Sequence, residues 1–474
     1  MKKCINTIKD NLLLIILVMQ PFLDVLAYIQ RNHSVSVAGY IRLALTVCMP
    51  VYTILLTKKK KPFLGAVGII AVFSFLHLLN SLRDGASGIF GDTKYLLLVI
   101  HMPVLFLCFL FLYEKESLKK QIIPALIANI IISVLIFYIS YFLKSGNSTY
   151  PLFNLGWTGW YVIPNAQSLV LVSLLPFAVF FSIKYCKYFF PLVCLPLIYM
   201  YTINGTKAAF WSLLATFVAV AGFVLAELVF VKRNLFRVYT VLTALCLIVV
   251  SLLCYNYSPR QIIDSTAESN RLQEQSDIDE LLKAEIEENI DDNDIDNLKN
   301  KNYIYVPYIN SNLIDRFGAD RVLEAYGENL NSYGLSNMRL KKLIFARLNW
   351  EDSDFATRLV GYKFTKMQYN GDNFDLENDP QAILYYYGYI GAALFIVFLG
   401  YYVVRALKQL ITHFKDTFNL FNFIIFLTLA LQLFAAAYSG YCFRRPNVSI
   451  YVMVVLLLIY CQTEPLFKKK AKIV

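Results

Sequence analysis

Two carboxylates, one residue apart, stand where polar chain runs into a long apolar segment. Glu377 and Asp379 flank Asn378, and the chain from residue 383 to about residue 404 is almost wholly apolar. Proline is favoured in the first turn of a helix, so we expect a membrane helix to begin near Pro380. A carboxylate at such a boundary could act as a catalytic base at the mouth of a membrane enzyme. The alternative is an acidic helix N-terminus favoured by the helix dipole alone.

Cations are predicted at other helix ends. Lys207 falls in the first turn of a predicted helix, where its charge opposes the helix dipole. An ammonium beside exposed backbone N–H groups suits an anion, although the side chain could instead simply extend toward water. Arg444 and Arg445 lie in a predicted outer turn, and Arg358 lies shortly before the two carboxylates. Asn165 enters an apolar span, where we expect a polar contact inside the helix bundle.

The composition predicts an all-α polytopic membrane protein. Hydrophobic residues make up 58% of the 474 residues, and the mean hydropathy is +0.53. Apolar runs of roughly 20 residues can each cross a hydrocarbon core of about 30 Å. The sequence predicts about twelve such spans: 12–30, 38–56, 63–82, 94–113, 121–143, 165–183, 188–204, 206–230, 238–256, 383–404, 418–438 and 447–463.

Charge predicts the orientation. If the N-terminus is inside, the inner segments hold 22 Lys and Arg, whereas the short outer segments hold eight. Excess positive charge in short loops marks the cytoplasmic side, so both termini are expected there. Segment 257–382 is then extracellular, and it carries 24 of the 33 acidic residues against 14 basic ones. The net charge of +11 therefore reflects loops that face anionic lipid, and nucleic acid is not an expected partner.

Three regions follow from these spans. Residues 1–256 form the first nine membrane helices, 257–382 the large extracellular segment, and 383–474 the last three helices with a basic cytoplasmic tail. Within the extracellular segment, residues 264–298 are strongly acidic and predict a solvated helix or a mobile insertion. Residues 312–368 have helical apolar spacing and predict folded helices.

Several polar residues fall inside apolar spans. Asp24 and Arg42 are expected at similar depth, so an ion pair is the economical account, either as a structural clamp or as part of a substrate pocket. His77 and His101 are expected to be hydrogen-bonded core residues.

The nine cysteines show no paired short spacing and are interpreted as small buried side chains. Cys254 and Cys442 both fall near the predicted outer face, which leaves a disulfide between them as an open alternative.

The chain resembles the O-antigen ligase and O-antigen polymerase superfamily. That family has a large outer segment before a late helix and a His-Asn pair eleven residues before the first glycine of Gly-x-x-Gly. Here Glu377-Asn378 stands at that spacing from Gly388. The Gln-Pro-x-x-Asp that ends at Asp24, the Gly-Thr-Lys that ends at Lys207 and the Glu-x-Asp of 377–379 are closer to Gram-positive O-antigen-ligase-like membrane proteins. Segment 257–382 contains no histidine, which departs from the family pattern.

The resemblance implies a GT-C-like enzyme that moves a glycan from an undecaprenyl-pyrophosphate carrier to an acceptor hydroxyl outside the bacterial plasma membrane. Glu377 would replace the family histidine as base, with Asp379 as its orienting partner, and a neighbouring carboxylate would raise one of the two pKa values. The expected contacts of the pyrophosphate and the site are Arg358, Lys207, Arg444 and Arg445, with Arg347, Asn165 and Asn378 as further candidates.

The expected reaction is an inverting single displacement without metal or other cofactor, although the Glu-x-Asp pair could instead bind a divalent cation. The partners implied are the lipid-linked glycan donor, a glycan or other hydroxyl acceptor, membrane lipid and possible polysaccharide-assembly proteins. Polymerase and ligase stay open. A transporter or flippase of lipid-linked oligosaccharide is the rival interpretation, which explains the large outer segment less well.

Overall fold

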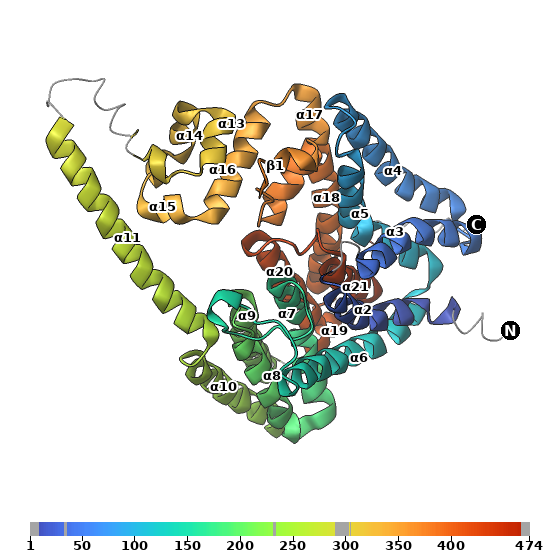
Figure 1. Ribbon diagram of the computed structural model, residues 1–474. Coiled ribbons are helices and arrows are strands. Elements are labelled where there is room, and N and C mark those ends of the chain that lie inside the picture. The colour runs from blue at the N-terminus through green and yellow to red at the C-terminus, as the bar shows by residue number, and fades with distance from the viewer. Residues whose placement is uncertain (1–8, 33–35, 231–233, 290–302, 304, 466–474) are drawn as a thin grey trace. The chain divides into compact units, whose positions relative to one another are not determined.

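The computed structural model describes residues 9–32, 36–230, 234–289, 303 and 305–465, and these are predominantly helical (Figure 1). The chain divides into two compact units. The first unit holds 1–72, 96–261 and 394–474, and the second holds 73–95 and 262–393. Helices α4, α5 and α18 each contribute residues to both units.

The first unit is a bundle of long apolar helices. Its elements are α2 (Leu12–Ile29), α3 (Val37–Leu56), the first half of α4 (Lys60–Arg83), most of α5 (Ile89–Leu112), α6 (Lys115–Phe142), α7 (Pro164–Phe181), α8 (Phe190–Asn204), α9 (Lys207–Phe230), α10 (Leu235–Tyr255), the second part of α18 (Asp379–Thr412), α19 (Phe414–Thr417), α20 (Leu420–Tyr438) and α21 (Pro446–Gln462).

The all-α polytopic fold is confirmed. Among the described residues, ten helical segments are long and apolar enough to cross a membrane. One of them, Pro164–Asn204, has 41 residues and contains α7 and α8, which the sequence predicts as two spans. A π-helical turn at Ser182–Cys186 separates those two helices. The last predicted span coincides with α21, which has 17 residues. The number twelve stays a prediction.

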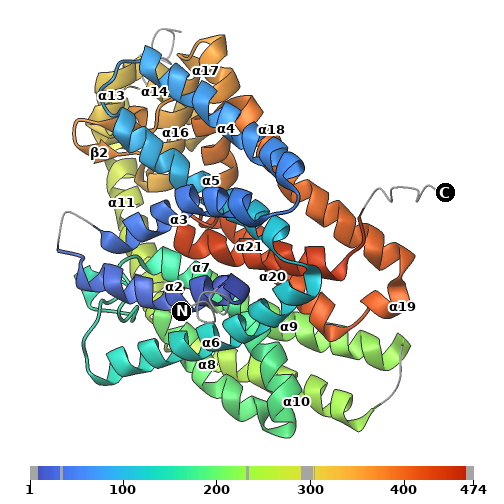
Figure 2. The same cartoon turned by 90° about the vertical axis from the view of Figure 1, so that its right-hand side faces the viewer.

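Two helices form the core of the first unit. Every residue of α7 from Ala166 to Phe181 is buried, and nearly all of α21 is buried. Helix α21 packs against α6, α7 and α20, and α7 also packs against α9 (Figure 2). A helix that is apolar on all sides is stable only when other helices surround it or when it faces lipid. Here the neighbouring helices surround both.

The second unit is built from short helices. Its elements are α11 (Pro259–Asn289, from residue 262), α13 (Ser311–Phe317), α14 (Ala319–Tyr326), α15 (Ser332–Ser336), α16 (Met338–Glu351), α17 (Phe355–Val360), a hairpin of β1 (Gln368–Tyr369) and β2 (Asp372–Asn373), the start of α18, and the adjoining ends of α4 and α5.

An aromatic core joins these short helices. Leu313 and Val322 are fully buried, as their helical spacing predicts. The ring of Phe345 on α16 stacks on Phe374 with centroids 3.9 Å apart, and it meets Phe317 edge-on at 5.2 Å. Helices α13, α14 and α16 therefore share one core with the chain that leads into α18.

Cys254 and Cys442 are both free thiols, so the disulfide between them is wrong. The acidic region 264–298 continues the helix α11 as far as Asn289, and its remainder lies outside the described residues.

Candidate functional site

The segment before α18 is fixed by its own polar side chains. The Oδ1 atom of Asn378 accepts a hydrogen bond from the backbone N of Gln381 at 3.0 Å, so Asn378 caps α18. The side chain of Asp379, in the first turn, is completely buried. The hydroxyl of Tyr386 donates to Asp375 Oδ1 at 3.0 Å and accepts from the N–H of Leu376, also at 3.0 Å. The chain that carries Glu377 is therefore held against the first turns of α18.

Glu377 is held in an ion pair with two cations of α16. Its Oε1 lies 2.7 Å from Lys342 Nζ, and its Oε2 lies 3.1 Å from Arg339 Nε. Burial raises the pKa of Glu377, but the hydrogen bonds and charges of Lys342 and Arg339 outweigh burial and hold the pKa below its ordinary value. The expected increase by a neighbouring carboxylate is wrong for this residue. In this state Glu377 is a weak base.

The two arginines predicted near Glu377 have other partners. Arg358 donates to the carbonyls of Trp350 at 3.3 Å and Glu351 at 2.8 Å, at the C-terminal end of α16. Arg347 pairs with the carboxylate of Glu351 at 2.8 Å, one turn further along the same helix. In the described part of the second unit, neither arginine makes a hydrogen bond or ion pair with Glu377. Both arginines instead stabilise the end of α16.

Two glycines, Gly388 in α18 and Gly361 after α17, allow two backbone segments to approach closely. Gly388 has φ 67° and ψ −173°, which interrupts the helical conformation within α18. A Cβ atom there would lie 2.5 Å from the carbonyl oxygen of Leu359, and one at Gly361 would lie 2.0 Å from the carbonyl oxygen of Tyr386. Only glycine avoids these clashes at a positive φ. The glycines therefore fix the segment after α17 against the helix that follows Glu377.

A buried His–Asp pair holds the same segment from the other side. The ring of His77 on α4 places Nδ1 2.8 Å from the carbonyl oxygen of Val360 and Nε2 3.2 Å from Asp92 Oδ2. Asp92 also accepts from Ser81 Oγ at 2.6 Å and from the N–H of Phe364 at 2.9 Å. A carbonyl only accepts, so Nδ1 carries a hydrogen, and the Nε2 contact is favourable only with a second proton between the two groups. The core role predicted for His77 is confirmed.

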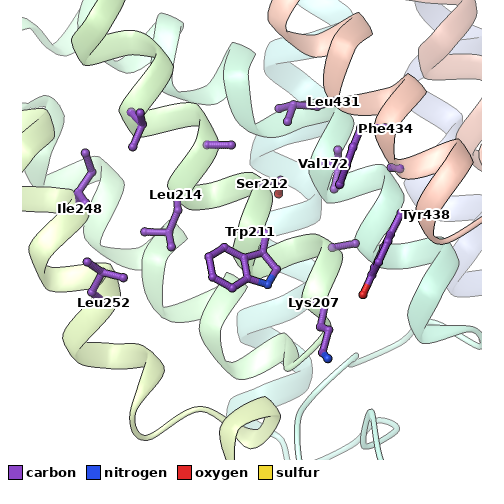
Figure 3. Close-up of a pocket in the computed structure, with 14 residues that line it drawn as sticks. Val172, Lys207, Trp211, Ser212, Leu214, Ile248, Leu252, Leu431, Phe434 and Tyr438 are labelled. Atoms are coloured by element: carbon purple, nitrogen blue, oxygen red, sulfur yellow. The ribbon is translucent and has the colours of Figure 1, made fainter. Parts of the chain in front are cut away.

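In the first unit, Lys207 lies at the start of α9 beside a groove. The groove has a volume of about 700 Å³ and is lined almost wholly by apolar side chains of α7, α9, α10 and α20. Figure 3 shows Lys207, the hydroxyl of Tyr438 and the indole of Trp211 toward one end of it, with Leu431 and Ile248 further along. A long apolar groove with a cation at one end has the shape and polarity of a lipid site.

The structure gives each of the other predicted residues of the first unit a local partner. Arg42 Nη2 lies 2.8 Å from Asp24 Oδ1, and Arg42 Nε donates to Gln20 Oε1 at 3.1 Å, so the structure brings this predicted pair together. Arg444 is buried and Arg445 is partly buried, with their guanidinium carbons 4.7 Å and 4.9 Å from the ring centroid of Tyr441. Asn165 is partly buried in the first turn of α7, where its carbonyl accepts from Ser168 Oγ at 2.8 Å.

With this geometry in view, the comparisons with known proteins identify the family. A family model described as O-antigen ligase like membrane protein matches residues 6–464, nearly the whole chain. The chain belongs to this family. No curated protein and no solved structure matches it. Membership places the chain among multi-pass membrane proteins with a glycan-transferring function in polysaccharide assembly.

The structure of this O-antigen ligase-like chain adds residues that sequence reasoning missed. Lys342 and Arg339 are the partners of Glu377, and Asp375 anchors the segment that carries it. The i, i+3 spacing of Arg339 and Lys342 places both on one face of a helix, which is a signal for a shared anionic partner. Among the described residues, no three His, Cys, Asp or Glu side chains are grouped to hold a metal ion.

Proposed function

We propose that this protein transfers a glycan from a polyprenyl-pyrophosphate carrier to an acceptor hydroxyl at the outer face of the bacterial plasma membrane. The observation that carries the proposal is the apolar groove with Lys207 at one end, within a family of glycan-transferring membrane proteins. An isoprenoid chain matches the apolar lining. The adjoining pyrophosphate matches an ammonium beside the first N–H groups of α9.

The ion pair of Glu377 supports a mechanism in which a substrate phosphate bound at α16 activates the base. In the absence of substrate, the negative charge of Glu377 is neutralised by Lys342 and Arg339. Such a phosphate carries more negative charge than a carboxylate and would compete for both cations. Glu377 released in this way becomes more basic. It can then accept the proton of the acceptor hydroxyl while that oxygen attacks the anomeric carbon and the pyrophosphate leaves.

The other predicted cations have supporting roles in the proposed reaction. Arg444 and Arg445 would add positive charge for the leaving group, whereas Arg358 and Arg347 would act through α16, which carries Arg339 and Lys342. Asn378 caps the helix that follows the base, Asn165 begins α7, and Asp24 with Arg42 ties α2 to α3. No step in this scheme requires a metal ion.

Analysis of lipid-linked glycans in cells tests the proposal. In a strain that carries only Glu377→Gln, carrier-linked units should accumulate at the outer face, because they are delivered but not transferred. Accumulated single repeat units would identify a polymerase, and accumulated long chains a ligase. Glu328→Gln removes an exposed carboxylate of the same unit and should leave transfer unchanged. Units that fail to reach the outer face would favour the flippase and contradict a transferase.

A further inference from the structure

A second hollow lies in the first unit at the opposite end of α8 from Lys207. It has a volume of about 450 Å³ and is lined by Lys184 and Lys187, by Asn234 and by apolar side chains that include Phe180, Phe236 and Leu420. The two linings share no residue, and Val172 of the groove lies eight positions before Phe180 of the hollow on α7, or roughly 12 Å along the helix axis. The hollow is therefore distinct from the proposed donor groove.

The backbone turn after α7 brings two lysines to this hollow. Residues 182–186 form a π-helical turn, and Lys187 has φ 48° and ψ −114°, an uncommon conformation for a residue with a side chain. The Lys184 ammonium lies 5.8 Å from the ring centroid of Phe180 and 5.2 Å from that of Tyr185. Among the described residues, no carboxylate lies within ion-pair distance of either lysine.

Two helix N-termini add positive potential. Helix α10 begins at Leu235 after the capping residue Asn234, whose side chain accepts from the N–H of Phe236 at 3.0 Å. Helix α20 begins at Leu420, which also lines the hollow. Helix N-termini carry a partial positive charge that favours anions. Glu227 on α9 is paired with Arg237, in the first turn of α10, at 3.3 Å.

We propose that this hollow binds the phosphate-bearing headgroup of an anionic phospholipid. Two uncompensated ammonium groups would bind the phosphate, and Phe180, Phe236 and Leu420 would contact the glycerol backbone and first acyl carbons. The site lies where membrane helices end, so a lipid reaches it by lateral diffusion. Bound lipid stabilises the end of α7, the helix buried on all sides, because a ligand that binds only the folded state shifts unfolding.

Purified full-length protein in nanodiscs tests this site. In discs of phosphatidylcholine with one quarter phosphatidylglycerol, the unfolding temperature of the wild type should exceed that in pure phosphatidylcholine by about 2–4 °C. The double variant Lys184→Gln/Lys187→Gln should lose this increase. The matched variant Lys58→Gln/Lys59→Gln removes two exposed lysines from the turn between α3 and α4 and should keep it. Equal loss in both variants would show surface charge alone and overturn the site.

Two further measurements separate the sources of the phosphate and guard against misfolding. Soluble glycerol phosphate, added to wild type in pure phosphatidylcholine discs, should give no increase; an equal increase would identify a soluble anion and overturn the lipid. A photoreactive phosphatidylglycerol should label peptides that contain Tyr188 or Phe236 in the wild type. Labelling confined to other helices would overturn the proposal even if the double variant does not fold.

Discussion

Lys342 Nζ lies 2.7 Å from Oε1 of Glu377, although 35 residues separate the two in the chain. This ion pair means that the candidate base is held inactive by the same kind of charge that the substrate requires. Substrate binding and base activation are then one event in the proposed reaction. A hydroxyl would not be deprotonated before a substrate phosphate has displaced Glu377 from these cations.

We predict that Glu377 makes the protein less stable in acid. Because the folded-state pKa of Glu377 lies below its ordinary value, its contribution is fully present above pH 4.5 and is lost as pH falls through the lower folded-state pKa. The unfolding temperature of wild type should therefore fall more steeply below pH 4.5 than that of Glu377→Gln. Parallel curves would show that the carboxylate is not stabilised by its two cations.

We predict that Lys342→Gln costs roughly 1 kcal/mol at pH 7, because it removes one partner of a half-buried ion pair. Urea unfolding of the full chain in one detergent measures the change. Lys341→Gln alters the neighbouring position on the same helix, whose side chain has no ion pair among the described residues, and should cost less. Equal costs would contradict the structural role of Lys342.

We predict that Gly361→Ala prevents normal folding of the second unit. The new Cβ would lie 2.0 Å from the backbone oxygen of Tyr386, and neither backbone can move without disturbing α18. Gly371→Ala is the control, since its φ is also positive, 85°, but no atom lies within 4 Å of its Cβ. It should cost only about 1 kcal/mol from conformational strain. Limited proteolysis and the yield of detergent-stable protein compare the two.

We predict that two aspartate-to-asparagine changes lower the free energy of unfolding by very different amounts. Asp92→Asn replaces a buried carboxylate that contacts His77 and accepts from Ser81 and Phe364, and it should cost about 3 kcal/mol, because breaking a buried, hydrogen-bonded pair is strongly destabilising. Asp84→Asn breaks the 2.7 Å contact between Asp84 and Lys366, two side chains that are each about one-third exposed. This change should cost less than about 1 kcal/mol. Thermal unfolding of both variants in the same detergent provides the comparison, and similar midpoints would refute the buried pair.

We predict that filling the apolar groove blocks transfer. Ala215→Trp places an indole in the groove and should lower the transfer rate by at least about tenfold, the equivalent of ~1.4 kcal/mol. Gly222→Trp lies on the same helix, where no atom lies within 4 Å of the added Cβ, and should retain most activity. Incorporation of labelled glycan into polysaccharide measures both. Full activity of Ala215→Trp would exclude this groove as the donor site.

The sequence predicts the helices well because membrane spans are local features. A run of about 20 apolar residues needs only the thickness of the bilayer for its interpretation, and each predicted range overlaps a helix of the structure. The pairing of Asp24 with Arg42 follows from the same logic, since an isolated charge in lipid is costly. The sequence also predicts α7 and α8 as two spans, but it does not indicate that a π-helical turn follows α7 in place of a polar loop.

The site is harder to predict, since its contacts join distant parts of the chain. Nothing in the local pattern around Glu377 indicates Lys342 or Arg339, and these two hold its pKa below the ordinary value against the effect of burial. Arg358 has the expected charge, yet the nearest acceptors for it are the last carbonyls of α16. Charge and position along the chain predict candidates, whereas the geometry of the helix ends decides their partners.

The enclosure of α7 has a consequence for biogenesis. Ser173 of this helix accepts a hydrogen bond from Gln432 at 2.9 Å, 259 residues later in the chain, and α20 and α21 cover two of its sides. During synthesis α7 therefore meets its last neighbours only after nearly the whole polypeptide has left the ribosome. A nascent chain that stops at residue 413 would present this helix to the insertion machinery or to quality-control proteases with its flank uncovered.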